Sequence, residues 1–113
     1  MVTITTKHNF DERVLCIEAN GHAGYAEAGK DIVCASVSIL LYTLAQSVRN
    51  MYELGSLADE PTVALAEGDA CIKCSFKDYD TFIEAFQNFS LIEVGYSLLA
   101  HNYPQYVRLE ALT

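Results

Sequence analysis

The sequence predicts an α+β protein, a two-layer sandwich in which a mixed or antiparallel sheet carries two long helices on one face. The pattern of apolar residues predicts the order strand, strand, helix, and the same order then occurs a second time. The length agrees, because 113 residues are enough for one hydrophobic core and too few for two. We therefore expect residues 1–113 to form a single domain.

The strands are predicted from alternation and from turn residues. Residues 2–8 alternate, and the β-branched pattern continues over 13–21 after a turn-like stretch, which indicates a hairpin. Two further short strands are predicted within 61–76, around the hairpin-turn pair Gly68-Asp69.

Both helices are predicted from apolar residues at spacings of three and four. The first should span residues 32–54, and the second should start near Asp78 or Asp80 and end before Pro104. The tail 105–112 alternates weakly and could add one more strand. The apolar stripe of the second helix should comprise Phe82, Phe86, Phe89, Ile92, Tyr96 and Leu99.

The charge of the chain limits its partners. Fifteen acidic residues against seven basic ones give a formal charge of -8, a poor match to nucleic acid, whose phosphates are bound by Lys and Arg. The same excess could attract a basic polypeptide, although a negative surface is also a common solubility device. We expect no direct nucleic-acid binding.

The chain shows no pattern that predicts export or membrane insertion. Its longest apolar region, residues 32–48, contains several polar residues and has helical periodicity, which indicates a core helix rather than a membrane span. No signal-peptide pattern opens the sequence. We therefore expect a cytoplasmic protein without membrane association, with free thiols at Cys16, Cys34, Cys71 and Cys74.

Most of the cysteines and histidines have a plain structural explanation. Cys71 and Cys74 have the spacing of half a zinc motif, but residues three apart on a strand point to opposite faces, so their sulfurs cannot share a metal. Cys16 also fits a buried structural thiol. Single histidines such as His8, beside a turn, and His101, at a helix end, are more often structural than catalytic. We expect no metal site and no cofactor.

Cys34 differs from the other cysteines because of its predicted place in a helix. If Asp31 is the N-cap, the Cys34 sulfur lies among unpaired N–H groups at the positive end of the helix dipole, where a thiol ionises more readily. His22 lies twelve residues earlier, across a loop rich in glycine and alanine that could fold back toward the thiol. A capped helix with a buried thiol is the plainer alternative, and the Asp31 charge would oppose ionisation of the thiol.

The stretch from Gly21 to Ser38 resembles the ribosomal-processing cysteine proteases, the Prp family. It reads Gly-His, a short loop, Gly-x-Asp-Ile-Val-Cys-Ala and a serine one turn beyond the cysteine, and the order of strands and helices agrees over almost the whole chain. The resemblance implies that His22 and Cys34 form a catalytic dyad. His22 would take the thiol proton, Cys34 would attack a peptide carbonyl, and N–H groups at the helix start or in the loop would hold the oxyanion.

The resemblance also implies supporting residues around the dyad. Asp31 would cap the helix and steer His22, and Ser38, at i+4 from Cys34, would share its flank. A substrate loop would contain Gly21, Gly24, Tyr25 and Gly29. The alternative is that these glycines serve ordinary turns.

For substrate, the resemblance implies a basic ribosomal protein precursor, the twenty-seventh protein of the large subunit, whose N-terminal extension is removed beside hydrophobic and aromatic residues. It also implies a homodimer. Two other classes of function compete with the endopeptidase: a non-catalytic ribosome-associated module that grips a peptide, and a redox sensor, which would need a resolving cysteine near Cys34. We expect the substrate to lie in an exposed groove beside the first helix.

Overall fold

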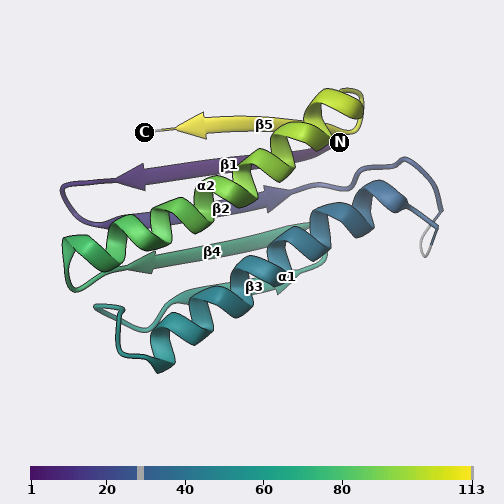
Figure 1. The fold of residues 1–113 in the computed structure, drawn as a ribbon. Helices are drawn as coiled ribbons and strands as arrows, with labels where there is room; N and C mark the ends of the chain where they lie inside the picture. The colour runs from purple at the N-terminus through teal and green to yellow at the C-terminus, as the bar shows by residue number, and fades with distance from the viewer. Residues whose placement is uncertain (28–29, 113) are drawn as a thin grey trace.

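The computed structural model describes residues 1–27 and 30–112, and within them the chain forms five strands and two helices (Figure 1). The predicted order of elements is confirmed, and so is the α+β class. In chain order the elements are β1 (Val2–Asn9), β2 (Val14–Asn20), α1 (Ile32–Glu53), β3 (Thr62–Ala66), β4 (Asp69–Ser75), α2 (Tyr79–Asn102) and β5 (Val107–Leu112).

The five strands form one mixed sheet in the order β3-β4-β2-β1-β5. All neighbouring pairs are antiparallel except β1 and β5, which run parallel with Val2 opposite Val107. Parallel strands need a long crossover, and α2 supplies it by carrying the chain from β4 to the far edge of the sheet (Figure 1). The weak alternation of the tail therefore does form a strand, at the edge next to β1.

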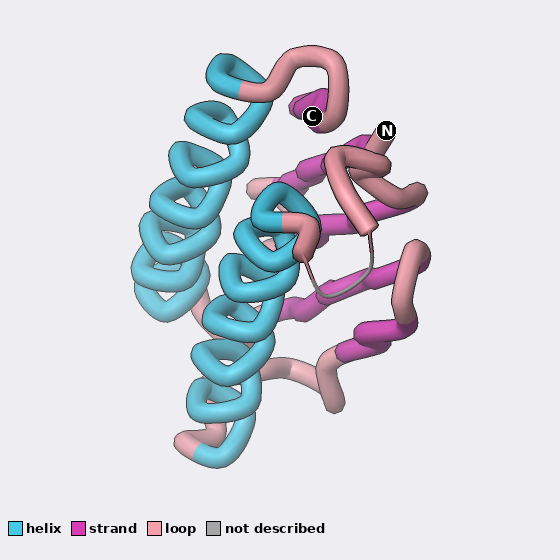
Figure 2. The backbone as a smooth tube through the Cα atoms, turned by 90° about the vertical axis from the view of Figure 1, so that its right-hand side faces the viewer, coloured by secondary structure: helices cyan, strands magenta, loops and turns pink. Residues whose placement is uncertain are grey.

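Both helices lie on the same face of the sheet, as Figure 2 shows. Strand residues of the covered face, such as Ile17 and Ile72, are fully buried beneath the helices. The helices are tied to each other by the Tyr96 hydroxyl, which donates to the carbonyl of Val37 at 3.0 Å. The opposite face carries no helix in the described part of the chain (Figure 2).

Aspartates begin both helices, as the sequence predicts. Asp31 caps α1, and Asp78 rather than Asp80 caps α2 by accepting from the N–H of Thr81 at 2.9 Å. This N–H also holds the pKa of Asp78 below its ordinary value, because it favours the ionised carboxylate.

By length and apolar composition alone, α1 could cross a membrane, since its 22 residues have a mean hydropathy of 1.5 over the most apolar window. Core helices of globular proteins pass the same test. In the fold α1 lays one face on the sheet and joins the common core, which agrees with the predicted core helix. The buried residues are Val33, Val37, Leu41, Leu44, Ala45 and Val48.

The turn between β3 and β4 differs by one residue from the prediction. Ala66 pairs with Asp69, so the two turn residues are Glu67 and Gly68, not Gly68 and Asp69. Gly68 has φ +75°, and the turn needs glycine there because this conformation strains residues that carry a Cβ. The difference matters because the turn lies beside the candidate active site.

Candidate active site

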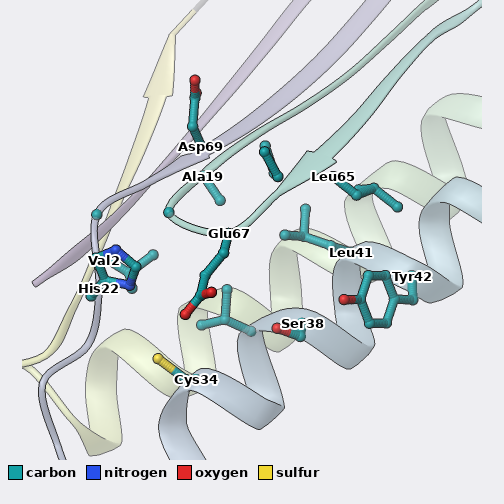
Figure 3. Close-up of a pocket in the computed structure, with 15 residues that line it drawn as sticks. Val2, Ala19, His22, Cys34, Ser38, Leu41, Tyr42, Leu65, Glu67 and Asp69 are labelled. Carbon is teal, nitrogen blue, oxygen red and sulfur yellow. The ribbon is translucent and has the colours of Figure 1, made fainter. Parts of the chain in front are cut away.

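An open cleft of about 330 Å³ lies beside the N-terminal half of α1. The end of β2, the first three turns of α1 and the β3–β4 turn form its walls (Figure 3). His22 and Cys34 both line it, together with Ser38 and Tyr42 of the same helix. The groove expected beside the first helix is therefore present, and the residues of the predicted dyad face it.

Cys34 occupies the third position of α1 and is half-buried at the edge of the core. Asp31 fixes this helix end, because its Oδ1 accepts from the N–H of Val33 at 3.0 Å and from that of Cys34 at 2.9 Å. The thiol thus lies at the positive end of the helix dipole with its sulfur directed into the cleft (Figure 3). The helix end therefore places the Cys34 sulfur where a bound peptide can reach it.

Asp31 also holds the loop before the helix. Its Oδ2 accepts from the N–H groups of Tyr25 at 3.1 Å and Ala26 at 3.3 Å, so one carboxylate joins the loop to the helix end. Donation from the Cys34 N–H, with further donation from Ala26 and Tyr25, holds the pKa of Asp31 below its ordinary value against the opposing effect of burial. The capping role is confirmed, and among the described residues no hydrogen bond joins Asp31 to His22.

His22 is exposed and follows directly on the end of β2, where the strand meets the β3–β4 turn. The N–H of Gly21 donates to the carbonyl of Gly68 at 2.9 Å, and a side chain at Gly21 would overlap the carbonyl oxygen of Met1. The imidazole packs on Gly68 so closely that a Cβ added there would lie 2.7 Å from His22 Nε2. The two glycines therefore set where the histidine ring lies.

His22 and Cys34 come from different walls of the cleft and project into the space between them (Figure 3). No hydrogen bond joins the two side chains within the described residues, which is common for catalytic pairs before substrate binds. A thiol at a helix N-terminus facing an imidazole across an open cleft can support nucleophilic attack followed by proton transfer to a leaving group.

The sequence does not indicate two of the residues that line the cleft. Glu67 directs its carboxylate toward Cys34 and His22, whereas Asp69 on the other side of the turn points away (Figure 3). Tyr42 lines the cleft two turns beyond Cys34 and is 53% exposed. No local motif marks them, since Glu67 reaches the site only through the pairing of β4 with β2.

The predicted substrate loop lies only partly at the cleft. Gly21 lines it, but Gly24 and Tyr25 are outside its lining. The Tyr25 ring instead makes edge-to-face contacts with Tyr103 and Tyr106, at centroid distances of 5.7 and 5.2 Å. Gly29 lies outside the described residues.

The remaining thiols are placed differently from Cys34. Burial raises the pKa of Cys74 to about 12 and contributes most to a similar rise for Cys16, so neither thiol ionises readily. Cys71 and Cys74 lie on opposite faces of β4, as predicted. None of the three lines the cleft.

The other histidines are also remote from the cleft. His8 packs edge-on against Phe10 and Phe86, each at 5.3 Å between ring centroids. His101 lies in the last turn of α2, where a positive charge is favoured by the helix dipole.

A thiol and an imidazole on one cleft of a two-layer α+β fold are the arrangement that a cysteine-dependent hydrolase would need. The family model described as "Cysteine protease Prp" matches residues 1–108, so the chain belongs to the Prp family of cysteine proteases. The predicted family resemblance and the cysteine endopeptidase activity are thereby confirmed.

Relatives agree with this assignment, and a solved structure shares the fold. The chain is 27% identical to the ribosomal processing cysteine protease Prp of Mycoplasma pneumoniae over 97% of its length and 94% of the relative, and 28% identical to that of Mycoplasma genitalium over 95% and 92%. The fold matches the crystal structure of an essential ribosomal processing protease Prp from S. aureus, in complex with a covalently linked product peptide. That match has a TM-score of 0.76 at 24% identity and covers 99% of this chain and 100% of the other.

Proposed function

We propose that the protein removes the N-terminal extension of the twenty-seventh protein of the large ribosomal subunit, with Cys34 as nucleophile and His22 as general base and acid. The observation that carries the proposal is the shared cleft. The only histidine and the only cysteine of the motif from Gly21 to Ser38 both line this open cleft of about 330 Å³.

The chemistry follows from the two groups. His22 takes the proton from the Cys34 thiol, and the thiolate attacks the carbonyl carbon of the scissile peptide bond. The resulting oxyanion collapses, the C–N bond breaks, and His22 gives its proton to the leaving amine of the mature protein. A water molecule, deprotonated by His22, then hydrolyses the thioester and releases the extension.

Asp31 and Ser38 have supporting roles in this proposal. The N–H groups of Val33 and Cys34 already donate to Asp31, so the oxyanion needs other donors. The Ser38 hydroxyl lines the cleft one turn beyond Cys34 and can donate to the substrate, as can N–H groups of the loop. Asp31 acts through the loop and helix that it joins.

The cleft suits an extended, partly apolar and partly basic peptide. Its floor contains apolar side chains, among them Val37, Leu41 and Leu65, which can receive hydrophobic residues beside the cut. The Glu67 carboxylate makes its rim acidic, in keeping with the net charge of -8 and with a basic client.

The proposal also covers the loop that contacts the substrate, the oligomeric state and the cellular compartment. We propose that the loop with Gly21, Gly24, Tyr25 and Gly29 contacts the substrate when it binds. We also propose a cytoplasmic homodimer that works without a cofactor. The outer face of α2 offers the apolar residues Leu91, Val94 and Leu98 for contact with a second copy, and light scattering after gel filtration measures the assembly.

Cleavage of the precursor tests the proposal. Purified protein is mixed with an excess of the ribosomal protein that carries its extension, and the products are read by intact-mass spectrometry. The unmodified chain should give one truncated product, whereas Cys34→Ala and His22→Asn should give none. His101→Asn is the matched control for the histidine and should cleave normally, because His101 lies outside the cleft.

The same experiment separates the endopeptidase from a peptide-binding module. Binding of the precursor without trimming, by the unmodified chain and Cys34→Ala alike, would contradict the proposed cleavage and support the module.

A further inference from the structure

Three potential metal ligands lie together on the sheet face that no helix covers in the described part of the chain (Figure 2). Strand pairing places Glu18 of β2 directly opposite Cys71 of β4, and Cys16 is two residues before Glu18 on the same face. The two Sγ atoms and one carboxylate oxygen all lie within 4.8 Å of one another.

We propose that Cys16, Glu18 and Cys71 form a zinc-binding site, with a water molecule as the fourth ligand. Two thiolates and a carboxylate are donors that zinc accepts in proteins. Ligand atoms around a tetrahedral zinc ion lie roughly 3.5 to 4 Å apart, so small side-chain rotations are enough to close the observed arrangement. Three ligands held on two paired strands need little reorganisation of the backbone.

The charges around the three residues can balance the charge of a zinc complex. In the free protein the Cys16 thiol donates to the Glu18 carboxylate at 3.8 Å. A zinc ion with two thiolates and one carboxylate carries a net charge of about −1. Lys7 and Lys73, which pair with Cys16 from the two neighbouring strands, can offset that charge.

Zinc can reach the site from solvent, and binding displaces protons. A hollow of about 480 Å³ on the open face is lined by Cys16 and Glu18 together with both lysines. Zinc binding replaces the protons of the two thiols. The hollow shares no residue with the cleft that contains Cys34.

The sequence alone predicts no metal site, and the proposed site pairs different cysteines from those of the Cys-x-x-Cys motif. Cys71 and Cys74 are three residues apart, but Cys74 is buried in the core beneath the helices. The partner of Cys71 is Cys16, which is distant in sequence and comes near only through the pairing of β2 with β4.

Titration with Co²⁺, a spectroscopic probe for zinc sites, tests the proposal. The parent for the titration is Cys34→Ala, because this removes the thiol of the cleft and makes the result independent of the proposed peptidase function. The parent should bind one Co²⁺ per chain with a thiolate-to-metal charge-transfer band in the near ultraviolet, and an equimolar amount of Zn²⁺ should displace it. Zinc should also raise the Tm of the parent.

Further substitutions in this parent assign the ligands. Cys71→Ser should weaken Co²⁺ binding by at least about 100-fold, since even loss of an outer-sphere partner commonly costs about 10- to 100-fold. Glu18→Gln should also weaken it, and it decides the matter if Cys71→Ser does not fold. Cys74→Ala is the matched thiol control and should bind as the parent does. Absence of the charge-transfer band in the parent, or an unchanged affinity in folded Cys71→Ser or Glu18→Gln, would overturn the proposal.

Discussion

Gly68 is the residue whose substitution most specifically tests how the fold positions His22. It lies in the β3–β4 turn with φ +75°, and an added Cβ would lie 2.7 Å from His22 Nε2 and 3.0 Å from Cε1. Gly68→Ala therefore has two separable effects, backbone strain in the turn and displacement of the imidazole.

The size of each effect follows from the geometry. A residue with a Cβ in the left-handed region costs about 1 to 2 kcal/mol of folding free energy. Ordinary van der Waals contact begins at 3.4 Å, so the His22 ring must move about 0.7 Å from its 2.7 Å contact. Since a misplacement of about 1 Å can lower a catalytic rate about 100-fold, we expect kcat to fall about 10- to 100-fold.

Gly55→Ala is the matched control for the strain. Gly55 has φ +78°, nearly the same as Gly68, but nothing lies within 4 Å of its added Cβ. Both variants should lose about 1 to 2 kcal/mol of unfolding free energy in urea titrations. Only Gly68→Ala should lose turnover on the ribosomal precursor, measured under conditions in which both proteins are folded.

An equal kcat for the two glycine variants would refute this reasoning. It would mean either that His22 tolerates the displacement or that the contact with the turn does not determine the position of the ring during catalysis.

Three further substitutions give graded results. Glu67→Gln should lower kcat/KM about 1.4- to fivefold, because an exposed carboxylate near the dyad contributes about 0.2 to 1 kcal/mol. Asp69→Asn, whose side chain points away, should leave kcat/KM unchanged, and equal effects of the two substitutions would contradict a role for Glu67. Asp31→Ala should cost about 1 kcal/mol of stability as a lost cap at neutral pH. The folded-state pKa of Asp31 is lowered, so the difference in unfolding free energy between the unmodified chain and Asp31→Ala should shrink only as the pH falls below the ordinary carboxyl range and through the folded-state pKa. A difference in urea unfolding that does not depend on pH would contradict this. Tyr96→Phe should cost about 1 kcal/mol by removing the hydrogen bond to Val37, and an unchanged Tm would show that the bond contributes nothing.

Local patterns predict most of the fold because the local and tertiary preferences agree. The periodicity of residues 32–54 and the cap at Asp31 locate α1 to within a residue. The alternation of 2–8 and 13–21 locates the first hairpin. The parallel pairing of β5 with β1 has no local signal, since it depends on where α2 returns the chain to the sheet.

The β3–β4 turn shows where local reasoning is insufficient. Gly68-Asp69 is a good turn pair, but the pairing of Ala66 with Asp69 makes Glu67 and Gly68 the turn residues. The register is set by the burial of alternate residues such as Ile72, because a slip by one residue would turn the apolar side chains toward solvent.

The candidate site also has residues that the sequence predicts and residues that only the fold brings together. His22 and Cys34 are recognisable because they lie in one short motif with the capping residue Asp31. Glu67 and the contact of Gly68 with the imidazole come from a hairpin far along the chain, and only the sheet brings them to the cleft. The proximity of Cys16 to Cys71 has the same origin.

Trapping the acyl-enzyme tests the central claim most directly. The protein is mixed with an excess of precursor peptide, quenched in acid at short times, and studied by intact-mass spectrometry and peptide mapping. We predict an adduct on Cys34 with the mass of the extension less one water, released by hydroxylamine, and neither adduct nor cleavage with Cys34→Ala. Cleavage that persists in Cys34→Ala, or an adduct on another residue, would contradict a mechanism with Cys34 as the nucleophile.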